Sequence, residues 1–361
     1  MNMANLLTLA AAVPSKSVQA TGWFLETAWL IPALPALSFF LILFFGKKMK
    51  YKGAEFGITA IALSLILAIC CVGQWMNQVD NASDNYKKNT PYETEEKYSE
   101  TSSQVLEENA SAEPIEVASA EQMNIYAAGE ESGYEAVAVD AVIERFTWWE
   151  TGGKKFQVGI MVDGLAVMML FVVTVISLLV HIYSTDYVSG DRRYTHYFAF
   201  LSLFSASMLF FVLSENILQT IVGWELVGVC SFALIGHWWE EKPNSDAALK
   251  AFLTNRVGDM GLLVGMIILF WSAGSWSIVD INVAAINNEI GQTTLLIASL
   301  CLTAAVMSKS GQFILHTWLP DAMAGPTPVS ALIHAATMVV AGIYMVAPLY
   351  GVFFEGYDIA G

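Results

Sequence analysis

The sequence predicts an all-α polytopic membrane protein with about eight transmembrane helices, and two observations support this class. Of its 361 residues, 55% are hydrophobic and only 14% are charged, whereas an average soluble domain has about 25% charged residues. Uncharged or nearly uncharged runs also recur at lengths that cross a bilayer. These properties exclude a soluble globular enzyme and a nucleic-acid-binding protein, which would require basic patches.

Eight apolar runs are long enough to span a bilayer, which requires about 20 residues. They are Ala28–Gly46, Gly57–Gln78, Gly164–Thr185, Tyr194–Ser214, Asn216–Trp239, Ala247–Val279, Gly291–Leu319 and Ala322–Phe354. We therefore divide the chain into four parts: an outside N-terminal segment (1–27), transmembrane helices 1 and 2 (28–79), an insertion (80–156) and a membrane domain with helices 3 to 8 (157–361).

Two clusters of basic residues predict the orientation, because Lys and Arg in short loops tend to stay in the cytoplasm. Lys47, Lys48, Lys50 and Lys52 follow the first run, and Arg192 and Arg193 follow the third. With both loops inside, the N-terminus, the insertion and Gly361 lie outside. The sequence thus predicts a multi-pass protein of the inner (cytoplasmic) cell membrane, in contact with the lipid bilayer.

The insertion carries most of the negative charge. The chain has a formal net charge of −16, of which −13 falls on residues 77–150. This segment is rich in Glu, Ser, Asn and Ala and has few large aliphatic residues, so it buries too little apolar surface to offset the entropy of ordering. We expect a disordered outside insertion; the alternative is a surface that collects cations or docks a partner.

Two ionisable residues lie deep in predicted spans, at a cost of about 2.5–3.5 kcal/mol each at a helix centre. Glu225 and Lys309 are placed near the bilayer midplane on different helices, which predicts that they pair. Ser308–Gln312 is a polar, glycine-containing interruption, as found where a helix breaks to line a cavity. Lys309 is therefore a candidate proton carrier whose occupancy depends on Glu225.

Three further charges and one histidine extend this hypothesis. Arg256 and Asp259 are spaced i, i+3 on one helix and can pair; Lys250 lies nearer to the cytoplasm. They either form a self-neutralised pair that lets the helix insert, or line a proton uptake path from the cytoplasm. His334 is either a hydrogen-bonded core residue or a proton relay. The other four histidines lie near span ends, where we expect them to be solvated.

Cysteine placement argues against bound redox groups in this chain. Cys70, Cys71, Cys230 and Cys301 lie inside predicted spans without metal-ligand spacing. A disulfide framework, iron–sulfur cluster or zinc site is therefore not expected, and no glycine-rich nucleotide fingerprint is present. We expect no cofactor and no metal in this chain.

Four sequence stretches carry a resemblance to a known family: Trp224–Gly228, Ala251–Asp259, Lys309–Ser310 and Thr317–Met338. They closely resemble subunit L (chain 5) of NADH–quinone oxidoreductase, respiratory complex I. The match runs from about Val158 to the end, and residues 1–156 match only as spans. That family is similar to the large subunits of multi-subunit sodium/proton antiporters.

The resemblance implies two inverted antiporter-like repeats, the first containing a broken seventh helix. It implies that Glu225, Lys309 and His334 relay protons and that Arg256 and Asp259 lie near the cytoplasmic uptake side. It further implies proton pumping coupled to quinone reduction elsewhere in the complex. NADH, FMN, iron–sulfur clusters and quinone would then be held by partner subunits, and the other membrane subunits of complex I would be its neighbours.

Two alternatives remain open at this point. The chain can be a subunit of a cation/proton antiporter or of a membrane inorganic-carbon transporter, or a structural anchor with vestigial charges. The chain also departs from the family, whose members have about fourteen or more helices. Because this sequence ends after the eighth, we expect a fragment, a split gene or a truncated gene product that does not pump alone. The resemblance supplies no role for the acidic insertion.

Overall fold

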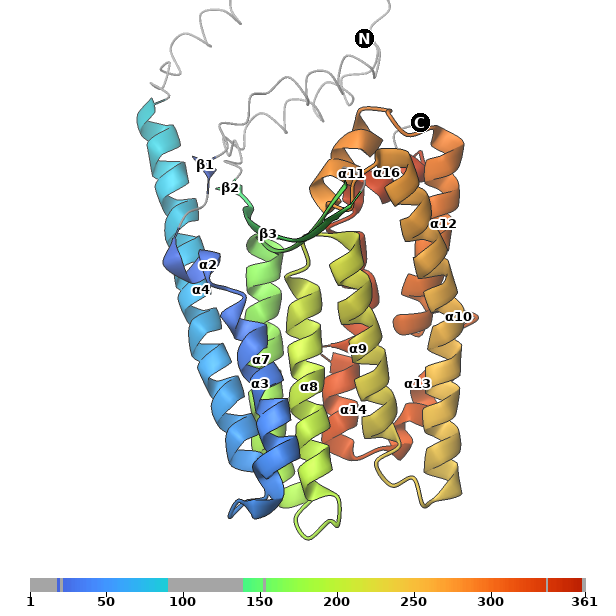
Figure 1. Cartoon of the computed structure of the whole chain (residues 1–361). Coiled ribbons are helices and arrows are strands. Elements are labelled where there is room, and N and C mark those ends of the chain that lie inside the picture. Colours follow the sequence, from blue (N-terminus) through green and yellow to red (C-terminus); the bar gives the residue numbers. More distant parts are fainter. Residues whose placement is uncertain (1–17, 20–21, 90–138, 152–153, 336, 359–361) are drawn as a thin grey trace, which may run out of the picture. The chain divides into compact units, whose positions relative to one another are not determined.

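The computed structural model describes residues 18–19, 22–89, 139–151, 154–335 and 337–358, and it is mostly helical (Figure 1). In this part of the chain, eight helical segments are long and apolar enough to cross a membrane. They are Leu30–Lys48, Ala54–Asn81, Gly164–Tyr187, Tyr194–Val212, Ile217–Ile235, Lys242–Ala273, Gln292–Lys309 and Thr327–Val346. The predicted polytopic helical class is confirmed.

The chain divides into two compact units. The smaller comprises Met1–Ala20 and Met76–Asp140; its described elements are the parallel pair β1 (Val18–Gln19) and β2 (Val139–Asp140) and the end of α4. The larger comprises Thr21–Trp75 and Ala141–Gly361. It contains the helix bundle and every candidate site residue.

A proline lies inside the first membrane helix, and a neighbouring helix compensates for it. After the short α2 (Trp23–Glu26), α3 (Leu30–Phe45) contains Pro35, which has no backbone N–H to donate to the carbonyl four residues earlier. That carbonyl, Ile31 O, accepts a hydrogen bond from Ser64 Oγ at 2.9 Å. Since Ser64 lies on α4 (Ala54–Asn89), this bond also joins the two helices.

The next four helices form the framework around the site: α7 (Gly164–Tyr187), α8 (Tyr194–Val212), α9 (Ile217–Ile235) and α10 (Lys242–Ala273). Two of them begin at side-chain caps. Asp163 accepts from Ala166 N at 2.6 Å to start α7, and Asn216 accepts from Gln219 N at 2.8 Å to start α9. The capping side chain of Asn216 therefore helps to fix where α9 begins.

The seventh membrane helix is broken, as the sequence predicts. Helix α12 (Gln292–Lys309) ends at Lys309, and residues 310–317 form turns before α13 (Trp318–Asp321) and the 3₁₀ turn η2 (Ala322–Ala324). Trp318 Nε1 donates to Ser308 O at 2.8 Å, so α13 caps a carbonyl that the broken helix leaves without a helical partner.

The predicted eighth span, Ala322–Phe354, is present as the membrane segment Thr327–Val346, but it is divided into short helices. The structure has α14 (Thr327–Ala335), α15 (Met338–Val346) and α16 (Tyr350–Gly356) instead. Thr337 adopts φ −134° and ψ −90°, and its hydroxyl donates to Leu332 O at 2.7 Å. Such side-chain bonds compete with helical hydrogen bonds and interrupt the helix. A further short helix, α11 (Ile278–Ile286), follows α10 and was not expected.

A β-hairpin accompanies the helices, and its first strand falls inside the predicted insertion (80–156). Strands β3 (Val142–Thr151) and β4 (Lys154–Val162) pair antiparallel, with Val142 opposite Val162. The β-branched and aromatic residues of β3 favour a strand. At the other end of the predicted disordered insertion, α4 continues to Asn89. Residues 90–138 lie outside the described part, so the expectation of disorder stays a prediction there.

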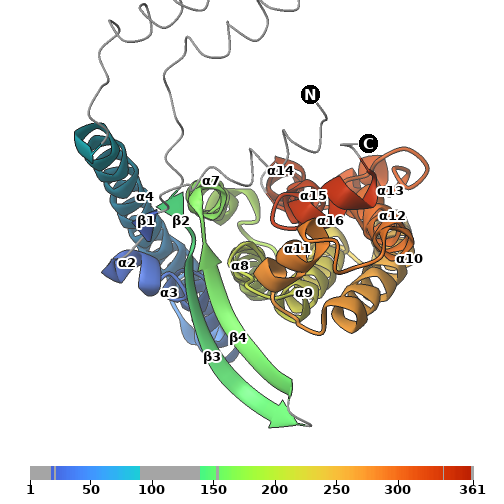
Figure 2. The same cartoon turned by 90° about the horizontal axis from the view of Figure 1, so that it is seen from above.

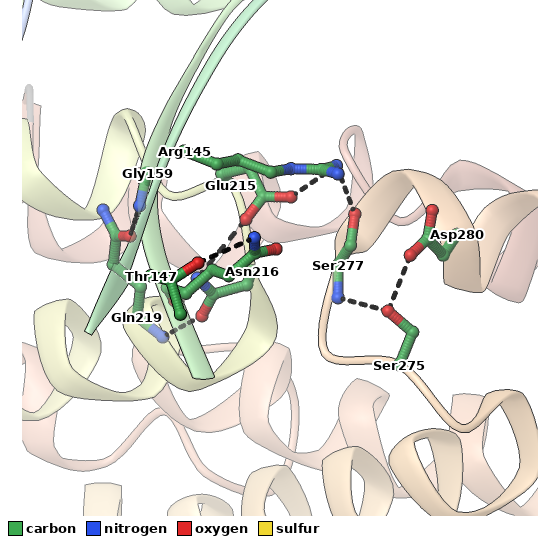
Figure 3. A network of polar contacts seen from close by, with 10 residues as sticks. Arg145, Thr147, Gly159, Glu215, Asn216, Gln219, Ser275, Ser277 and Asp280 are labelled. Atoms are coloured by element: carbon green, nitrogen blue, oxygen red, sulfur yellow. Dashed lines mark hydrogen bonds and ion pairs between the residues drawn. The ribbon is translucent and has the colours of Figure 1, made fainter. Parts of the chain in front are cut away.

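Polar contacts tie the hairpin to the ends of the membrane helices. Arg145 forms an ion pair of 2.7 Å with Glu215, which is buried just before α9, and donates to Ser277 Oγ at 2.9 Å just before α11 (Figure 3). Gln219 accepts from Gly159 N at 3.2 Å. Seen from above, the two strands run past α8, and one end of the strand pair projects beyond the helices (Figure 2). The hairpin therefore belongs to the membrane domain.

Candidate functional site

Helix α9 presents three functionally placed residues in one turn. Trp224 is buried, and its Nε1 donates to Asp259 Oδ1 on α10 at 2.6 Å. Gly228 lies four residues later and therefore on the same helix face, because an α-helix has 3.6 residues per turn. Glu225 is turned about 100° from that face. The residues of this turn of α9 therefore point in two different directions.

Arg256 on α10 connects two carboxylates. Its Nη1 forms an ion pair with Glu225 Oε2 and lies 3.6 Å from Asp259 Oδ2. The predicted contact between Arg256 and Asp259 is therefore present. The Asp259 side chain is only 4% exposed, whereas those of Glu225 and Arg256 are 25% and 36% exposed. We call Glu225, Arg256 and Asp259 the charge cluster; two negative charges share one positive charge.

Lys309 is the last residue of α12 and is only 1% exposed. Its Nζ has no hydrogen-bond partner among the described residues. It lies 5.4 Å from the centre of the Trp224 ring, a cation–π contact. The position at the end of α12 also favours a cation, because the helix dipole is negative there. A Cβ at position 228 would lie 2.8 Å from Nζ, so the glycine leaves room for the ammonium.

The predicted direct pair between Glu225 and Lys309 is wrong. Glu225 pairs with Arg256, and Lys309 lies against the Trp224 and Gly228 face of α9. The reason is helical geometry, since neighbouring residues point in directions about 100° apart. Depth in the membrane was estimated from sequence position, but direction around the helix axis was not.

The charge cluster still acts on Lys309 through space. The two carboxylates attract a lysine ammonium and Arg256 repels it, because opposite charges attract and like charges repel. Because Asp259 is buried and bonded to Trp224, Trp224 lies between the charge cluster and Lys309 and contacts both. The sequence motif contains Trp224, but nothing in its residue type indicated this role.

Close packing of α10 against α12 brings these groups together. A Cβ at Gly258 would collide with the Ser308 side chain and lie 3.0 Å from Ala304 O. Gly258 precedes Asp259, and Ser308 precedes Lys309. The absence of a side chain at position 258 therefore allows the helix that carries Asp259 to approach the helix that carries Lys309. This requirement was also missed, because a single glycine in an apolar helix is a weak signal.

Lys250 and His334 are not part of this group. Lys250 Nζ is 2.6 Å from Asp321 Oδ2, and both side chains are almost half exposed. His334 lies on α14, and both of its ring nitrogens are buried without a hydrogen-bond partner in the described part of the chain. Both interpretations of His334, the core histidine and the proton relay, therefore stay hypotheses.

Two of the remaining histidines are buried rather than solvated. His181 is fully buried, with ring nitrogens 2.7 Å from Ser177 O and 3.3 Å from Ser202 Oγ. His237, in the turn after α9, lies 3.3 Å from Asp191 Oδ2. Burial lowers the pKa of His237, and the Asp191 carboxylate opposes this by favouring the charged ring.

Asp191→Asn should therefore lower the pKa of His237 further, because it removes the negative charge that stabilises the imidazolium. NMR titration of the ring carbon and nitrogen signals in labelled protein would measure the change. His196→Gln is a control, since a positive neighbour acts in the opposite direction. An unchanged or raised pKa in Asp191→Asn would show that Asp191 does not stabilise the charged ring.

Within the residues that the structure describes, no group of three or more His, Cys, Asp or Glu side chains is arranged to hold a metal ion. The four cysteines are unpaired. The site itself brings together one buried lysine, one shared arginine and two carboxylates from three helices.

Two family profiles and several known proteins match this chain. Residues 214–360 match the profile of the NADH:quinone oxidoreductase/Mrp antiporter transmembrane family, and residues 148–198 match that of the complex I chain 5 N-terminus. The chain is also 46% identical over 215 residues to NAD(P)H-quinone oxidoreductase subunit 5 of Adiantum capillus-veneris chloroplasts. Residues 214–360 thus carry the transmembrane domain of the NADH:quinone oxidoreductase/Mrp antiporter family. The second profile begins at residue 148 within β3, so the end of β3 and all of β4 lie in the matched region.

The chain spans about a third of the length of the curated relatives that it matches. The fern match spans 58% of the chain and 30% of the relative, and chain 5 of a Picosynechococcus species is 46% identical over 57% of the chain and 32% of the relative. Solved structures share the fold: the Mrp complex of a Dietzia species has a TM-score of 0.65 at 22% identity, covering 92% of this chain and 29% of that one. An archaeal membrane-bound sulfane sulfur reductase has a TM-score of 0.66 at 17% identity, covering 93% and 55%.

Proposed function

We propose that this chain is a proton-translocating membrane subunit of an NAD(P)H–quinone oxidoreductase. The observation that carries the proposal is Lys309: a fully buried ammonium without a hydrogen-bond partner, at the end of a broken helix and beside the charge cluster. Burying an ionisable group in a membrane is costly, and such groups usually serve transport. The names of the curated relatives support the type of complex.

In this mechanism Lys309 carries the proton, and Arg256 links its occupancy to Glu225. When Arg256 neutralises Glu225, Asp259 remains free to stabilise a charged Lys309. When Arg256 moves to Asp259, Lys309 loses that attraction, and its proton passes towards His334. Glu225 therefore acts on Lys309 through Arg256 and not by direct contact. Quinone chemistry in other subunits would drive the change by altering the electrostatics at Glu225.

Proton uptake is proposed from the side where α10 begins. Lys250 and Asp321 mark the rim of that side, and Arg256 and Asp259 lie two to three turns further along α10. The partners in this proposal are the other membrane subunits, which complete the path, and the subunits that hold NAD(P)H, FMN, iron–sulfur clusters and quinone. The location is an energy-coupling membrane, with the N-terminus outside.

Glu225→Gln in the assembled complex is the direct test. Glutamine keeps the shape but removes the charge that Arg256 neutralises, so we expect fewer protons moved per electron pair in proteoliposomes. Glu289→Gln, in an exposed loop, is the matched control. An unchanged proton-to-electron ratio and rate of quinone reduction in Glu225→Gln would refute the role of Glu225.

The same vesicles distinguish the proposal from the antiporter alternative, since the matched family profile also includes Mrp antiporters. A cation/proton antiporter subunit would exchange sodium for protons under an imposed pH difference without any electron donor. Under the proposal, proton movement requires electron transfer and persists without sodium. Proton movement that follows sodium and ignores electron transfer would replace the proposal with the alternative.

A further inference from the structure

A cavity of about 1130 Å³ opens at one end of the bundle, where α8 begins and α9 ends. Its wall also includes the 3₁₀ turn η1 (Gly46–Lys48) and the first turns of α10. This is the end at which the Lys and Arg distribution predicts the cytoplasm. The charge cluster and Lys309 do not line this cavity.

Positive charge dominates this cavity. Four lining residues are basic, Lys47, Lys52, Arg192 and Arg193, and a single lining residue, Glu240, is acidic. Glu240 is engaged by Arg193, which also donates to His237 O. Lys47, Lys52 and Arg192 have no ion pair in the described part of the chain. The cavity therefore has an uncompensated positive charge and suits an anion.

Further along α8 lies a second, mostly apolar cavity, and we call the two cavities together the groove. Phe200 on α8 lines the basic cavity, and Leu203, Ser207 and Phe210 line a second cavity of about 560 Å³. Their spacing of three or four residues places them on one face of α8. Ten residues of helix correspond to about 15 Å, which is about the length of a lipid acyl chain.

Residues of the neighbouring helices α9 and α3 also line the groove. Phe232 of α9 lines the basic cavity, and Leu226 and Val222 of α9 line the second one. Ala33 of α3 contributes a small side chain to its wall. At the far end the hairpin closes the groove through Phe146 and Ile160. The groove is thus basic at one end and lined mainly by apolar residues beyond it, with Glu144 and Gln219 near the hairpin.

We propose that this groove binds one anionic phospholipid. The phosphate lies at Lys47 and Arg192, and one acyl chain lies along α8 and α9 towards the hairpin. Basic pockets between transmembrane helices at the cytoplasmic side bind anionic lipid headgroups. A soluble anion would not use the apolar extension, and an apolar partner helix would not use the basic end. A phospholipid of negative charge matches both.

The test measures lipid retained by the assembled complex, using native mass spectrometry after transfer from nanodiscs that contain phosphatidylglycerol and phosphatidylcholine. The variant Lys47→Gln with Arg192→Gln should weaken phosphatidylglycerol binding by roughly 30-fold, because it removes two basic residues that each attract the anionic lipid. The control is Lys48→Gln with Lys50→Gln, which changes two exposed lysines of the same loop that do not line the cavity. Equal retention in the two variants would overturn the proposal.

A second variant tests the acyl-chain part without changing any charge. Ala33→Phe should reduce phosphatidylglycerol retention by filling the groove, whereas Leu37→Phe, at an exposed position outside it, should not. Displacement of the lipid by millimolar inorganic phosphate would assign the basic end to a soluble anion and overturn the lipid proposal. So would equal retention of phosphatidylcholine, or a partner-subunit helix occupying the groove in a structure of the complex.

Discussion

Lys309→Met should leave the complex assembled but slow proton transfer through this subunit by at least about a hundredfold, the usual cost of removing a positioned proton-transfer group. Methionine has nearly the length of lysine and fills the same space beside Trp224 and Gly228. Replacing a buried ion by an apolar residue of similar volume is often neutral or stabilising. Stability and function are therefore expected to separate.

The measurement is proton uptake per electron pair in proteoliposomes, with the amount of assembled complex determined on native gels. Lys242→Met is the control, because Lys242 is exposed at the start of α10 and lies outside the charge cluster. A structural anchor with vestigial charges predicts normal pumping in Lys309→Met. Normal pumping in both variants would thus support the anchor and reject the relay.

Gly258→Ala should destabilise the membrane domain by about 2 kcal/mol, because overpacking a close contact typically costs about 1–3 kcal/mol. The added methyl group would collide with Ser308 and approach Ala304 O to 3.0 Å. Helices α10 and α12 would have to separate, which moves Asp259 away from Lys309. We therefore expect a lower thermal denaturation midpoint and a loss of pumping in the complex that remains.

Gly73→Ala is the matched control for this substitution. Gly73 also lies in a helix, but a Cβ there has nothing within 4 Å. Alanine should therefore stabilise α4 by up to about 1 kcal/mol. The double variant Gly258→Ala with Ser308→Gly removes the colliding side chain and should recover part of the lost stability. If Gly258→Ala and Gly73→Ala had the same midpoint, the close approach at Gly258 would not be needed.

Hydropathy and local signals were sufficient for the spans and for several details. The eight membrane segments, the broken helix at Lys309 and the i, i+3 contact of Arg256 with Asp259 follow from composition, spacing and a polar interruption. These features depend on residues close together in the chain. The hairpin was missed because its first strand adjoins an acidic segment and shows no alternation of apolar and polar residues.

The pairing of charges could not be read from spacing. Glu225 and Lys309 have similar predicted depth, yet Glu225 pairs with Arg256. Lys309 lies instead against Trp224 and Gly228 of α9. Likewise, the basic cavity combines residues from η1, the loop before α8 and the end of α9. Depth in a membrane follows from position along the chain. The direction in which a side chain points, and which helix lies opposite, follows from how the helices pack, because each residue turns the helix face by about 100°.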